Sequence, residues 1–585
     1  MAQCNCRIKA SCSKDNLLKG NKWTKYEKAA LDHASASVFL SANEVINDAP
    51  DRLLYGVNEN PPMFSAMLFG FQHYLTMFGS TVAVPFLLAP SLCIKDNPLA
   101  MCEILNTVFF VSGVATLLQT TFGCRLPIVQ GATFAFIGPT IAILELKPFQ
   151  CPVEKRNSTD RFTAIHDWKK GMREIQGAII IASTLQVIIG FTGLIGYLMR
   201  FIGPLTIATT ISLVGLSLFR MTGEFAGKHW GLASVNVFFI TLFSQMLKKR
   251  IKIFKLFPVA LSLGASWMIS IIITLIKNGQ LDNKGQADVM RQASWFKIPL
   301  PAPWGYPTFH LGSSIGMLAG VLVSIIESVG NYISCARMSG APFPPSHAIN
   351  RGIAIEGLSC ILAGLWGSGN GTTSYSENIA AIGVTKVASR RVIQFGAISI
   401  IFFSVFGKFG AFFTMIPVPI IGGMFWVLFG VIVSVGLSSL EHADLKSHRN
   451  LYVLGFSLFN GMVLPDWVIK NRNDIRTGVE ELDQTLYILL SSHMAVGGIT
   501  ALLFDNIIPG TAKERGLMEW HKNSLSTYPK EERAIYDIPF VQKYLNGKNW
   551  VKYFPFLPHH PKNDGGYERT AYVRFGAIKD TFINL

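Results

Sequence analysis

Two hydrophobic segments of this chain are interrupted, one by Gln130-Gly131-Ala132-Thr133-Phe134-Ala135-Phe136 and the other by Ser374-Tyr375-Ser376-Glu377-Asn378. Each segment is apolar enough to enter a bilayer, yet glycine, hydroxyl and amide residues stand where a continuous helix would carry leucine. Irregular backbone at membrane depth survives only where it is buried in protein or lines a water-filled cavity. Two such breaks, one in each half of the chain, are typical of a secondary transporter that holds its substrate between half-helices.

The composition indicates a membrane protein. Half of the 585 residues are hydrophobic, 15% are charged and 42 are phenylalanine, and the mean hydropathy is +0.36. The net charge of +16 comes from short clusters between the apolar segments and from the tails, which is a topology signal, so we exclude a nucleic-acid partner. Walker, HExxH and CxxC motifs are absent, so the sequence predicts neither an enzyme nor a metal site. It also shows no cleavable signal peptide.

The apolar segments number about fourteen, in two sets of seven, and predict an all-α polytopic membrane protein. They cover residues 63–90, 103–122, 127–147, 173–197, 202–220, 229–247 and 256–276, and then 310–334, 350–367, 373–385, 392–410, 413–438, 450–468 and 486–506. Several, including segment 10, are shorter than the ~20 residues of a straight span. We divide the chain into a cytoplasmic N-terminal tail (1–60), a first seven-segment repeat (61–276), an extracellular loop (277–309), a second repeat (310–508) and a cytoplasmic C-terminal tail (509–585).

Lysine and arginine residues predict the orientation of the segments. Five of them lie between residues 248 and 255, in the link from segment 6 to segment 7, and the links after segments 8, 10 and 12 are also basic. Because all of these links join an even segment to an odd one, both termini are predicted to be cytoplasmic. Asn157-Ser158-Thr159 is a glycosylation acceptor in an odd-to-even loop, which must then be extracellular.

Three cysteines fall in the first two predicted extracellular loops, where a disulfide can persist: Cys93, Cys102 and Cys151. We favour a bond between Cys93 and Cys151, which would tie the two loops together. The sequence leaves Cys102 open as the alternative partner.

Ionisable residues deep inside a span are costly and by default mark a functional pathway. Three residues meet this criterion: His73, Glu327 and Glu377. Asn331 follows Glu327 by four positions, so both side chains project from one helix face. The glycine-rich residues 367–371 precede Glu377 and let the backbone extend before a helix starts. Free N–H groups at that start suit an anionic or carbonyl-bearing ligand.

Each candidate also has a structural interpretation. The alternative for Glu327 is an acid held by serine or backbone hydrogen bonds, and the alternative for Glu377 is a helix cap without ligand contact. His73 is as well suited to orient a neighbouring carboxylate as to contact a ligand. Glu356 lies beside basic residues near the start of segment 9, and we interpret it as structural.

At these residues the chain resembles the nucleobase–ascorbate transporter family, over about residues 52–555. The family's signature in the tenth span appears as Glu377-Asn378-Ile379-Ala380-Ala381-Ile382-Gly383-Val384-Thr385-Lys386, with Ala380 where glycine is usual. Gln72-His73 matches a motif of the first span, and Glu327 matches the substrate-binding acid of the eighth. The segment that follows Glu327 is similar to the animal branch, whose best-known members are sodium–ascorbate cotransporters.

The resemblance implies a seven-plus-seven inverted repeat in a plasma-membrane homodimer, with a core domain (spans 1–4 and 8–11) that moves like an elevator past a gate domain (spans 5–7 and 12–14). Under this resemblance, the candidate substrate-binding residues are His73, Gln130, Gly131, Phe134, Glu327, Glu377 and Asn378. Sodium is the usual coupling ion of the animal branch, and no other cofactor is expected. The candidates for ion coupling are His73, Glu327 and Asn331.

Three departures from ascorbate carriers bear on the substrate. Glu377 stands where they carry proline, Asn331 stands where they carry aspartate, and Gln130-Gly131-Ala132-Thr133-Phe134 stands in place of their Gln-Ala-Ser-Ala-Phe. Ascorbate is an anion at neutral pH, and a second carboxylate nearby opposes it. Uracil, xanthine and hypoxanthine instead present ring N–H donors, which Glu327 and Glu377 can accept in charge-assisted bonds.

The hypothesis is therefore a transporter that moves nucleobases into the cell, coupled to Na⁺. The alternative is a sodium-dependent ascorbate cotransporter. Proton coupling and facilitated diffusion stay open, and so do three other classes: an ion channel, an intramembrane hydrolase and a transport-dead scaffold.

Overall fold

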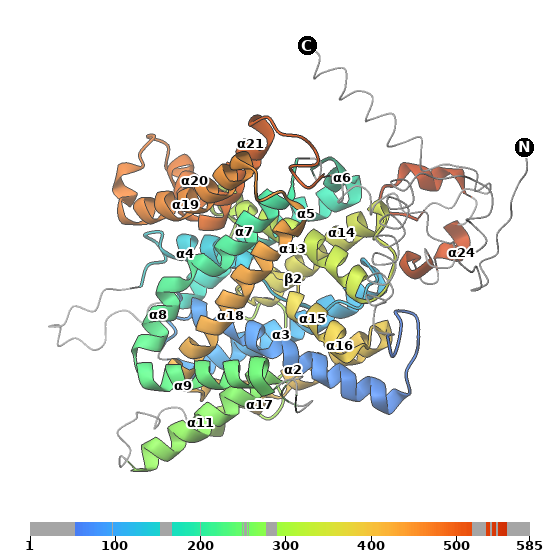
Figure 1. Ribbon diagram of the computed structural model, residues 1–585. Coiled ribbons are helices and arrows are strands. Elements are labelled where there is room, and N and C mark those ends of the chain that lie inside the picture. Colours follow the sequence, from blue (N-terminus) through green and yellow to red (C-terminus); the bar gives the residue numbers. More distant parts are fainter. Residues whose placement is uncertain are drawn as a thin grey trace, which may run out of the picture. The chain divides into compact units, whose positions relative to one another are not determined.

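The computed structural model describes residues 53–95, 97–151, 167–198, 201–247, 257–276 and 289–517, residues 250 and 254, and the parts 534–538, 541–545 and 548–558 of the C-terminal segment. Helices dominate these residues, and two short strands lie among them (Figure 1). The glycosylation acceptor Asn157 and the N-terminal tail up to residue 52 lie outside the described residues.

The described elements follow the predicted segments along the chain. The first half has α2 (Met63–Leu88), α3 (Pro98–Thr121), β1 (Gln130–Ala132), η2 (Phe134–Phe136), α4 (Ile137–Leu144), α5 (Trp168–Thr192), α6 (Leu194–Leu198), α7 (Pro204–Ser217), α8 (Phe219–Gly227), α9 (Trp230–Thr241), η3 (Leu242–Met246) and α11 (Pro258–Ile276). The second half has α13 (Leu311–Met338), α14 (Ser346–Trp366), β2 (Thr372–Ser374), α15 (Ser376–Thr385), α16 (Arg390–Val405), α17 (Gly407–Thr414), α18 (Val418–Ser438), η5 (Ser439–His442), α19 (His448–Lys470), η6 (Arg472–Asp474), α20 (Glu480–Ser491) and α21 (His493–Ile507). The C-terminal segment adds η8 (Ala534–Tyr536), α24 (Gln542–Leu545) and η9 (Asn549–Tyr553).

Eight helical spans among the described residues are long and apolar enough to cross a membrane, and one of them runs through both α7 and α8. The pair α20–α21, bent by 80°, would make nine if it counts as one span. The chain is therefore a mostly helical, multi-pass membrane protein. Predicted segments 3, 6 and 10 coincide with the shorter helices α4, α9 and α15. The prediction of about fourteen passages stays a prediction, because these helices are too short to span a bilayer without extended backbone.

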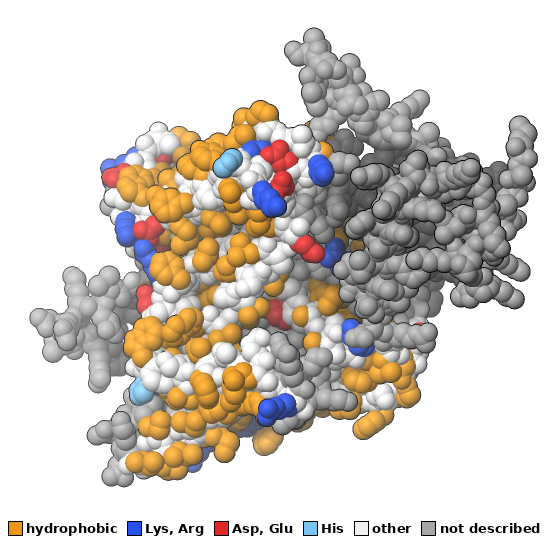
Figure 2. Space-filling model, viewed as in Figure 1, with side chains coloured by type: hydrophobic (Ala, Val, Ile, Leu, Met, Phe, Trp, Pro, Cys, Tyr) orange, Lys and Arg blue, Asp and Glu red, His pale blue; other side chains and the backbone are white. Residues whose placement is uncertain are grey.

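The surface of the described helices is strongly apolar, and hydrophobic side chains cover much of the face in Figure 2. Phe238 on α9, Leu275 on α11 and Phe459 on α19 are 60%, 73% and 72% exposed. Soluble monomers rarely expose apolar patches this extensive. These helix faces are therefore suited to contact lipid.

The helices pack in two groups. In the first group, α5 packs along α14, and α16 packs along both α2 and α3. In the second group, α7 packs against α18, α19 and α21, and α18 also packs against α8 and α9. Helix α13 contacts both groups, because it packs against α5 as well as against α7, α20 and α21.

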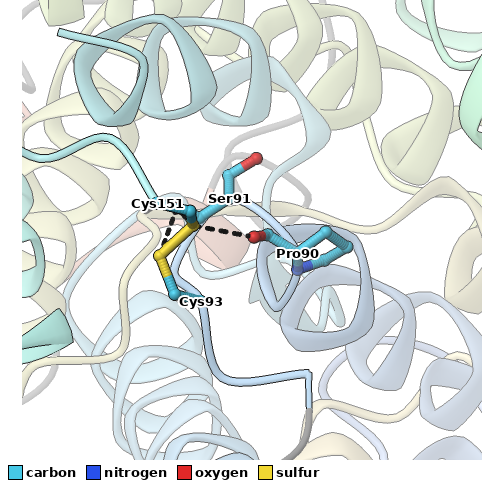
Figure 3. The surroundings of a disulfide bond; sticks show 4 residues. All are labelled: Pro90, Ser91, Cys93 and Cys151. Carbon is cyan, nitrogen blue, oxygen red and sulfur yellow. Dashed lines mark hydrogen bonds between the residues drawn. A yellow bond between two sulfur atoms is a disulfide. The ribbon is translucent and has the colours of Figure 1, made fainter. Parts of the chain in front are cut away.

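A disulfide joins Cys93 and Cys151, whose Cα atoms lie 5.7 Å apart (Figure 3). This is the pair that the sequence favours, and Cys102, the alternative partner, is a buried free cysteine. The sulfur of Cys151 lies 3.3 Å from the carbonyl oxygen of Pro90. The bond therefore fixes residue 151 against the turn that follows α2.

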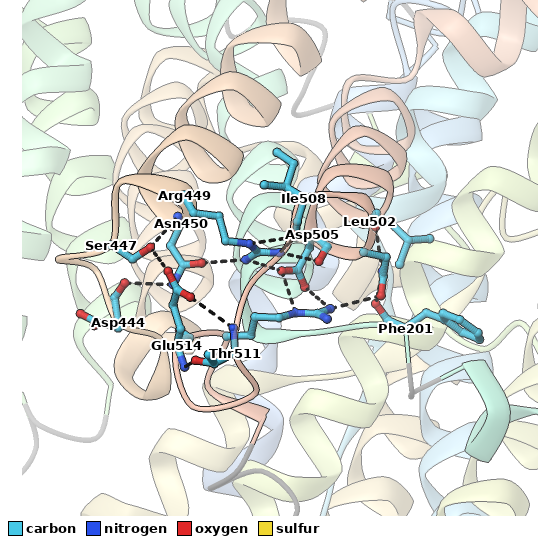
Figure 4. Close-up of polar contacts among 12 residues, drawn as sticks. Phe201, Asp444, Ser447, Arg449, Asn450, Leu502, Asp505, Ile508, Thr511 and Glu514 are labelled. Carbon is cyan, nitrogen blue, oxygen red and sulfur yellow. Dashed lines mark hydrogen bonds and ion pairs between the residues drawn. The ribbon is translucent and has the colours of Figure 1, made fainter. Parts of the chain in front are cut away.

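A buried ion cluster joins the start of α19 to the end of α21 (Figure 4). The carboxylate of Asp505, which is 1% exposed, pairs with Arg449 and with Arg515, each at 3.0 Å. Arg449 also donates to the carbonyl oxygens of Asp505 and Ile508, at 2.5 and 2.9 Å. These bonds satisfy helix-end carbonyl groups that lack partners within α21.

Candidate functional site

The two interrupted segments meet in one small sheet. Strands β1 and β2 pair antiparallel, with Gln130 opposite Ser374 and Gly131 opposite Thr373. Every residue of both strands is buried. Residues 244 positions apart thus satisfy each other's backbone groups, which irregular backbone at membrane depth requires.

Glycines turn the chain from α14 into β2. Helix α14 ends at Gly367, with φ +70°, and Gly369 follows with φ +71°, a left-handed conformation that favours glycine. The side chain of Asn370 donates to the carbonyl oxygen of Thr133 at 2.8 Å, so the turn is held against the first break. After β2 the chain starts helix α15 at Ser376.

The absence of a side chain at Gly131 makes room for the ring of Tyr375. A Cβ atom at position 131 would lie 2.4 Å from Cζ of Tyr375. The hydroxyl of Tyr375 donates to the carbonyl oxygen of Ala132 at 2.9 Å and lies 3.2 Å from the hydroxyl of Thr81 on α2. Gly131, a predicted substrate residue, therefore has a packing role between the two breaks.

Gln130 forms hydrogen bonds through its backbone and through its side chain. Its backbone N–H donates to Oγ1 of Thr116 on α3 at 2.9 Å. Its side-chain Nε2 donates to Oγ of Ser374 at 2.8 Å, across the strand pair. The other side-chain atom, Oε1, is buried and has no hydrogen-bond partner among the described residues.

Glu377 lies in the first turn of α15 and is partly buried. Its Oε1 accepts a hydrogen bond of 2.6 Å from the hydroxyl of Ser80 on α2. The hydroxyl of Ser376 donates to Oε2 at 3.4 Å, which is a long contact. One carboxylate oxygen is thus fixed by the protein, and the other is held only weakly.

Glu327 and Asn331 both lie on α13, as predicted, but they differ in their contacts. The Oε2 atom of Glu327 is buried and has no hydrogen-bond partner among the described residues. The side chain of Asn331 donates to the carbonyl oxygen of Ser374 at 2.7 Å, so it holds β2 in place. The carboxylate of Glu327 lies near enough to that of Glu377 for the two to repel each other.

His73 and Asn378 form a direct contact between α2 and α15. The amide Nδ2 of Asn378 donates to the carbonyl oxygen of His73 at 2.8 Å and lies 3.2 Å from its Nδ1. Both residues are buried. The Oδ1 atom of Asn378 is buried without a partner among the described residues. The sequence suggested that His73 orients a carboxylate, but the side chain that it contacts is the amide of Asn378.

Phe134 begins η2 directly after the first break and is buried. Its ring packs edge-on against that of Phe429 on α18, with 5.5 Å between the centroids. Through this contact, the first break touches a helix of the second packing group.

Glu356 is completely buried and contacts β2. It accepts hydrogen bonds from Ser328 at 2.6 and 2.8 Å and from Tyr332 at 3.2 Å. Gln186 on α5 donates to it at 3.3 Å, and Ser374 on β2 donates at 3.4 Å. The carboxylate therefore links α5, α13, α14 and β2, which agrees with the structural interpretation but places Glu356 much nearer to the site than the sequence suggested.

Sequence reasoning missed Ser80 and Tyr375. Ser80 follows His73 by seven positions, so two helical turns place both on one face of α2. This spacing could have indicated Ser80. No comparable signal marks Tyr375, because its contacts with Gly131 and Thr81 depend on the pairing of two distant segments.

The site contains three buried acceptor atoms that lack donors among the described residues: Oε1 of Gln130, Oε2 of Glu327 and Oδ1 of Asn378. Unsatisfied acceptors in a buried site are costly, and a ligand with N–H or O–H donors would satisfy them. In the described part of the chain, no group of His, Cys, Asp and Glu residues is arranged to hold a metal ion. These acceptors make the two breaks and α13 the candidate site for a polar small molecule.

The relatives of this chain show that it belongs to a class of membrane transporters. Residues 64–470 match the profile of the xanthine/uracil permeases, described as the Permease family. Solute carrier family 23 member 1 of Rattus norvegicus is 43% identical over 539 residues, which cover 86% of this chain and 89% of that protein. Solute carrier family 23 member 2 of Homo sapiens is 42% identical, over 91% of this chain and 86% of that protein. The chain belongs to the xanthine/uracil permease family, and the resemblance seen in its sequence is confirmed.

Plant proteins and solved structures complete the comparison. Nucleobase-ascorbate transporter 1 of Arabidopsis thaliana is 35% identical, over 83% of this chain and 96% of that protein. Among solved structures, the transmembrane domain of the cyanobacterial bicarbonate transporter BicA has a TM-score of 0.44 at 13% identity, over 76% of this chain and 99% of that chain. The structure of SLC26A9 has a TM-score of 0.46 at 11% identity, over 76% of this chain and 66% of that chain.

Proposed function

We propose that this chain is a secondary active transporter that moves nucleobases of the uracil, xanthine and hypoxanthine class into the cell. The observation that carries the proposal is the set of three buried acceptors without donors, on Gln130, Glu327 and Asn378. Nucleobases present several ring N–H groups on one edge, and a charged acceptor such as Glu327 forms strong hydrogen bonds with them. The plant relative named a nucleobase-ascorbate transporter is consistent with this substrate class.

The carbonyl groups of a nucleobase need donors, and the start of α15 supplies them. The first N–H groups of a helix lack partners within the helix and carry partial positive charge. Glu377 lies in that first turn, so its weakly held Oε2 is available next to these N–H groups. A ligand with alternating donors and acceptors therefore suits this end of the site.

The charge of the site favours a neutral ligand over an anion. Glu327 and Glu377 lie close enough to repel each other, and a bound anion would add a third negative charge. A sodium-dependent ascorbate cotransporter is the second candidate, since the plant relatives carry both substrates in their name. A sodium ion bound near the two carboxylates would offset this repulsion in either case.

We assign the coupling ion as Na⁺, with His73, Glu327 and Asn331 as the candidates for its coupling. Asn331 uses its Nδ2 on Ser374, so its contribution to an ion would come from Oδ1. The two helix packing groups support a core that carries the site and a gate beside it, as in a seven-plus-seven inverted repeat. Phe134 lies in the proposed core and Phe429 in the proposed gate, so an elevator-like movement of the core would change the contact between their rings. A homodimer in the plasma membrane, with both termini cytoplasmic, belongs to the same proposal.

Uptake of radiolabelled xanthine, uracil, hypoxanthine and ascorbate into cells that express the chain tests the substrate class. We expect saturable uptake of at least one nucleobase, with competition by the others and without competition by ascorbate. Ascorbate accumulation without nucleobase uptake would show that the second candidate is right. Replacement of external Na⁺ by choline tests the coupling ion, and undiminished uptake in choline would rule out sodium.

A further inference from the structure

Three arginines from separate segments gather at one end of the first packing group. Arg125 follows α3, Arg351 lies in the second turn of α14, and Arg390 is the first residue of α16. Arg351 donates to the carbonyl oxygen of Gly123 at 2.8 Å, and Arg390 donates to that of Arg125 at 2.8 Å. The positive charge of Arg125 repels those of Arg351 and Arg390, and Arg351 is only 3% exposed. The cluster therefore needs acceptors beyond those of its own helices.

Residues 534–538 of the C-terminal segment supply these acceptors. The carbonyl oxygen of Tyr536 accepts from Arg351 at 2.7 Å, and that of Ile535 accepts from Arg390 at 3.0 Å. The carboxylate of Asp537 interacts electrostatically with both Arg125 and Arg351. A short peptide with one negative charge thus neutralises part of the cluster.

The ring of Tyr536 is enclosed by the same surface. Tyr536 is only 1% exposed. Its hydroxyl donates to the carbonyl oxygen of Pro342, ahead of α14, at 2.5 Å. Removing a large aromatic ring from water stabilises the contact that buries it. Tyr536 is therefore the anchor of this segment.

The segment touches the helices again farther along. The side chain of Asn350 donates to the carbonyl oxygen of Pro555 at 3.1 Å, and the ring of Phe556 packs edge-on against Phe191 of α5, with centroids 4.8 Å apart. Gly193, with φ +75°, ends α5 beside Pro555, and a Cβ there would lie 2.5 Å from Pro555 Cβ. The two contacts lie on the neighbouring helices α14 and α5.

We propose that the three arginines form a binding socket whose ligand is the chain's own C-terminal segment, with Tyr536 and Asp537 as the recognised side chains. The bound segment ties the connection between α3 and β1 to the starts of α14 and α16. The connection between α3 and β1 leads directly into Gln130. Helix α14 carries Glu356 and leads into β2. Docking of the segment therefore supports the helices that position both strands of the site.

The test cuts the segment free after the whole protein has folded. A protease recognition sequence is inserted after residue 525, and the protein is purified in detergent, cleaved and passed over a size-exclusion column. We expect the fragment that contains residues 534–558 to stay with the membrane part. Tyr536→Ala should release it, with at least about tenfold less fragment retained, which corresponds to 1.4 kcal/mol.

Tyr544→Ala is the matched control, because Tyr544 lies in the same segment but is 74% exposed; it should retain the fragment as the unmodified chain does. Release of the fragment from the unmodified cleaved chain would overturn the proposal. Equal retention by Tyr536→Ala and the unmodified chain would overturn the assignment of Tyr536 as the anchor. A second measurement compares chains that end at residue 558 and at residue 533. Only the second should melt several degrees below the full chain, and equal melting of all three would contradict the supporting role of the segment.

Discussion

The hydroxyl of Ser80 donates a 2.6 Å hydrogen bond to Oε1 of Glu377, and the two residues are 297 positions apart. Ser80 is 2% exposed and lies on α2, two turns after His73, which contacts Asn378. One helix thus holds two successive residues of the α15 start. Fixing one oxygen of Glu377 orients the other oxygen, which we propose as a substrate acceptor.

Ser80→Ala should raise the KM for nucleobase uptake and lower kcat/KM by about tenfold, because the charge-assisted bond that orients Glu377 is lost. Uptake kinetics at constant surface expression measure the effect. Ser434→Ala is the control, since the hydroxyl of Ser434 donates to the carbonyl oxygen of Gly430 on an exposed face of α18. Unchanged kinetics in Ser80→Ala would contradict the orienting role.

Glu327→Gln should reduce uptake at least about 100-fold while surface expression persists, because the amide keeps the shape but loses the charged acceptor. Surface biotinylation and uptake are measured on the same cells. Glu480→Gln, on the exposed side of α20, should leave uptake unchanged. Near-normal kinetics of Glu327→Gln would remove Glu327 from the proposed site.

Gly131→Ala should abolish transport, because the new methyl group would lie 2.4 Å from the ring of the buried Tyr375. Overpacking of this kind costs about 1–3 kcal/mol, so a lower melting temperature should accompany the loss. Gly264→Ala on α11 is the matched control, since a Cβ there meets nothing within 4 Å. Normal uptake by Gly131→Ala would mean that the two breaks do not pack as described.

Asp505→Asn should lower the stability of the protein by about 3–5 kcal/mol, because Arg449 and Arg515 would be left without their shared carboxylate. Thermal melting in detergent measures this loss. Glu441→Gln offers a contrast, since its pair with Arg337, at 3.8 Å, is exposed on both sides and contributes about 0–1 kcal/mol. Similar melting of the two variants would show that the cluster does not stabilise the helix ends.

Asn157→Gln tests the predicted orientation of the loop between segments 3 and 4. If this loop is extracellular, the variant should migrate at a smaller glycosylated mass with unchanged substrate preference. Enzymatic deglycosylation of the unmodified chain should give the same mass. An unchanged mass would contradict the expected glycosylation.

The positions of the two breaks could be predicted, but their pairing could not. Glycine, hydroxyl and amide residues within apolar segments are visible in the sequence, and β1 and β2 lie within these stretches. The register that sets Gln130 opposite Ser374 depends on how α3, α13 and α14 pack. Glu356 shows the same limit, because the basic residues near it in the sequence do not contact it, whereas hydroxyl groups from α13 and β2 do.

The sequence by itself determined that the chain enters a membrane, that two of its helices are broken, and which family it belongs to. These properties depend on the composition and residue order within single segments, so they can be predicted without knowing how the segments pack. Only the tertiary structure decided that Ser80 binds Glu377, that Tyr375 packs over Gly131 and that the C-terminal segment binds the arginine cluster. Each of these contacts joins residues far apart in the chain, and the packing of whole helices, not any local preference, brings them together.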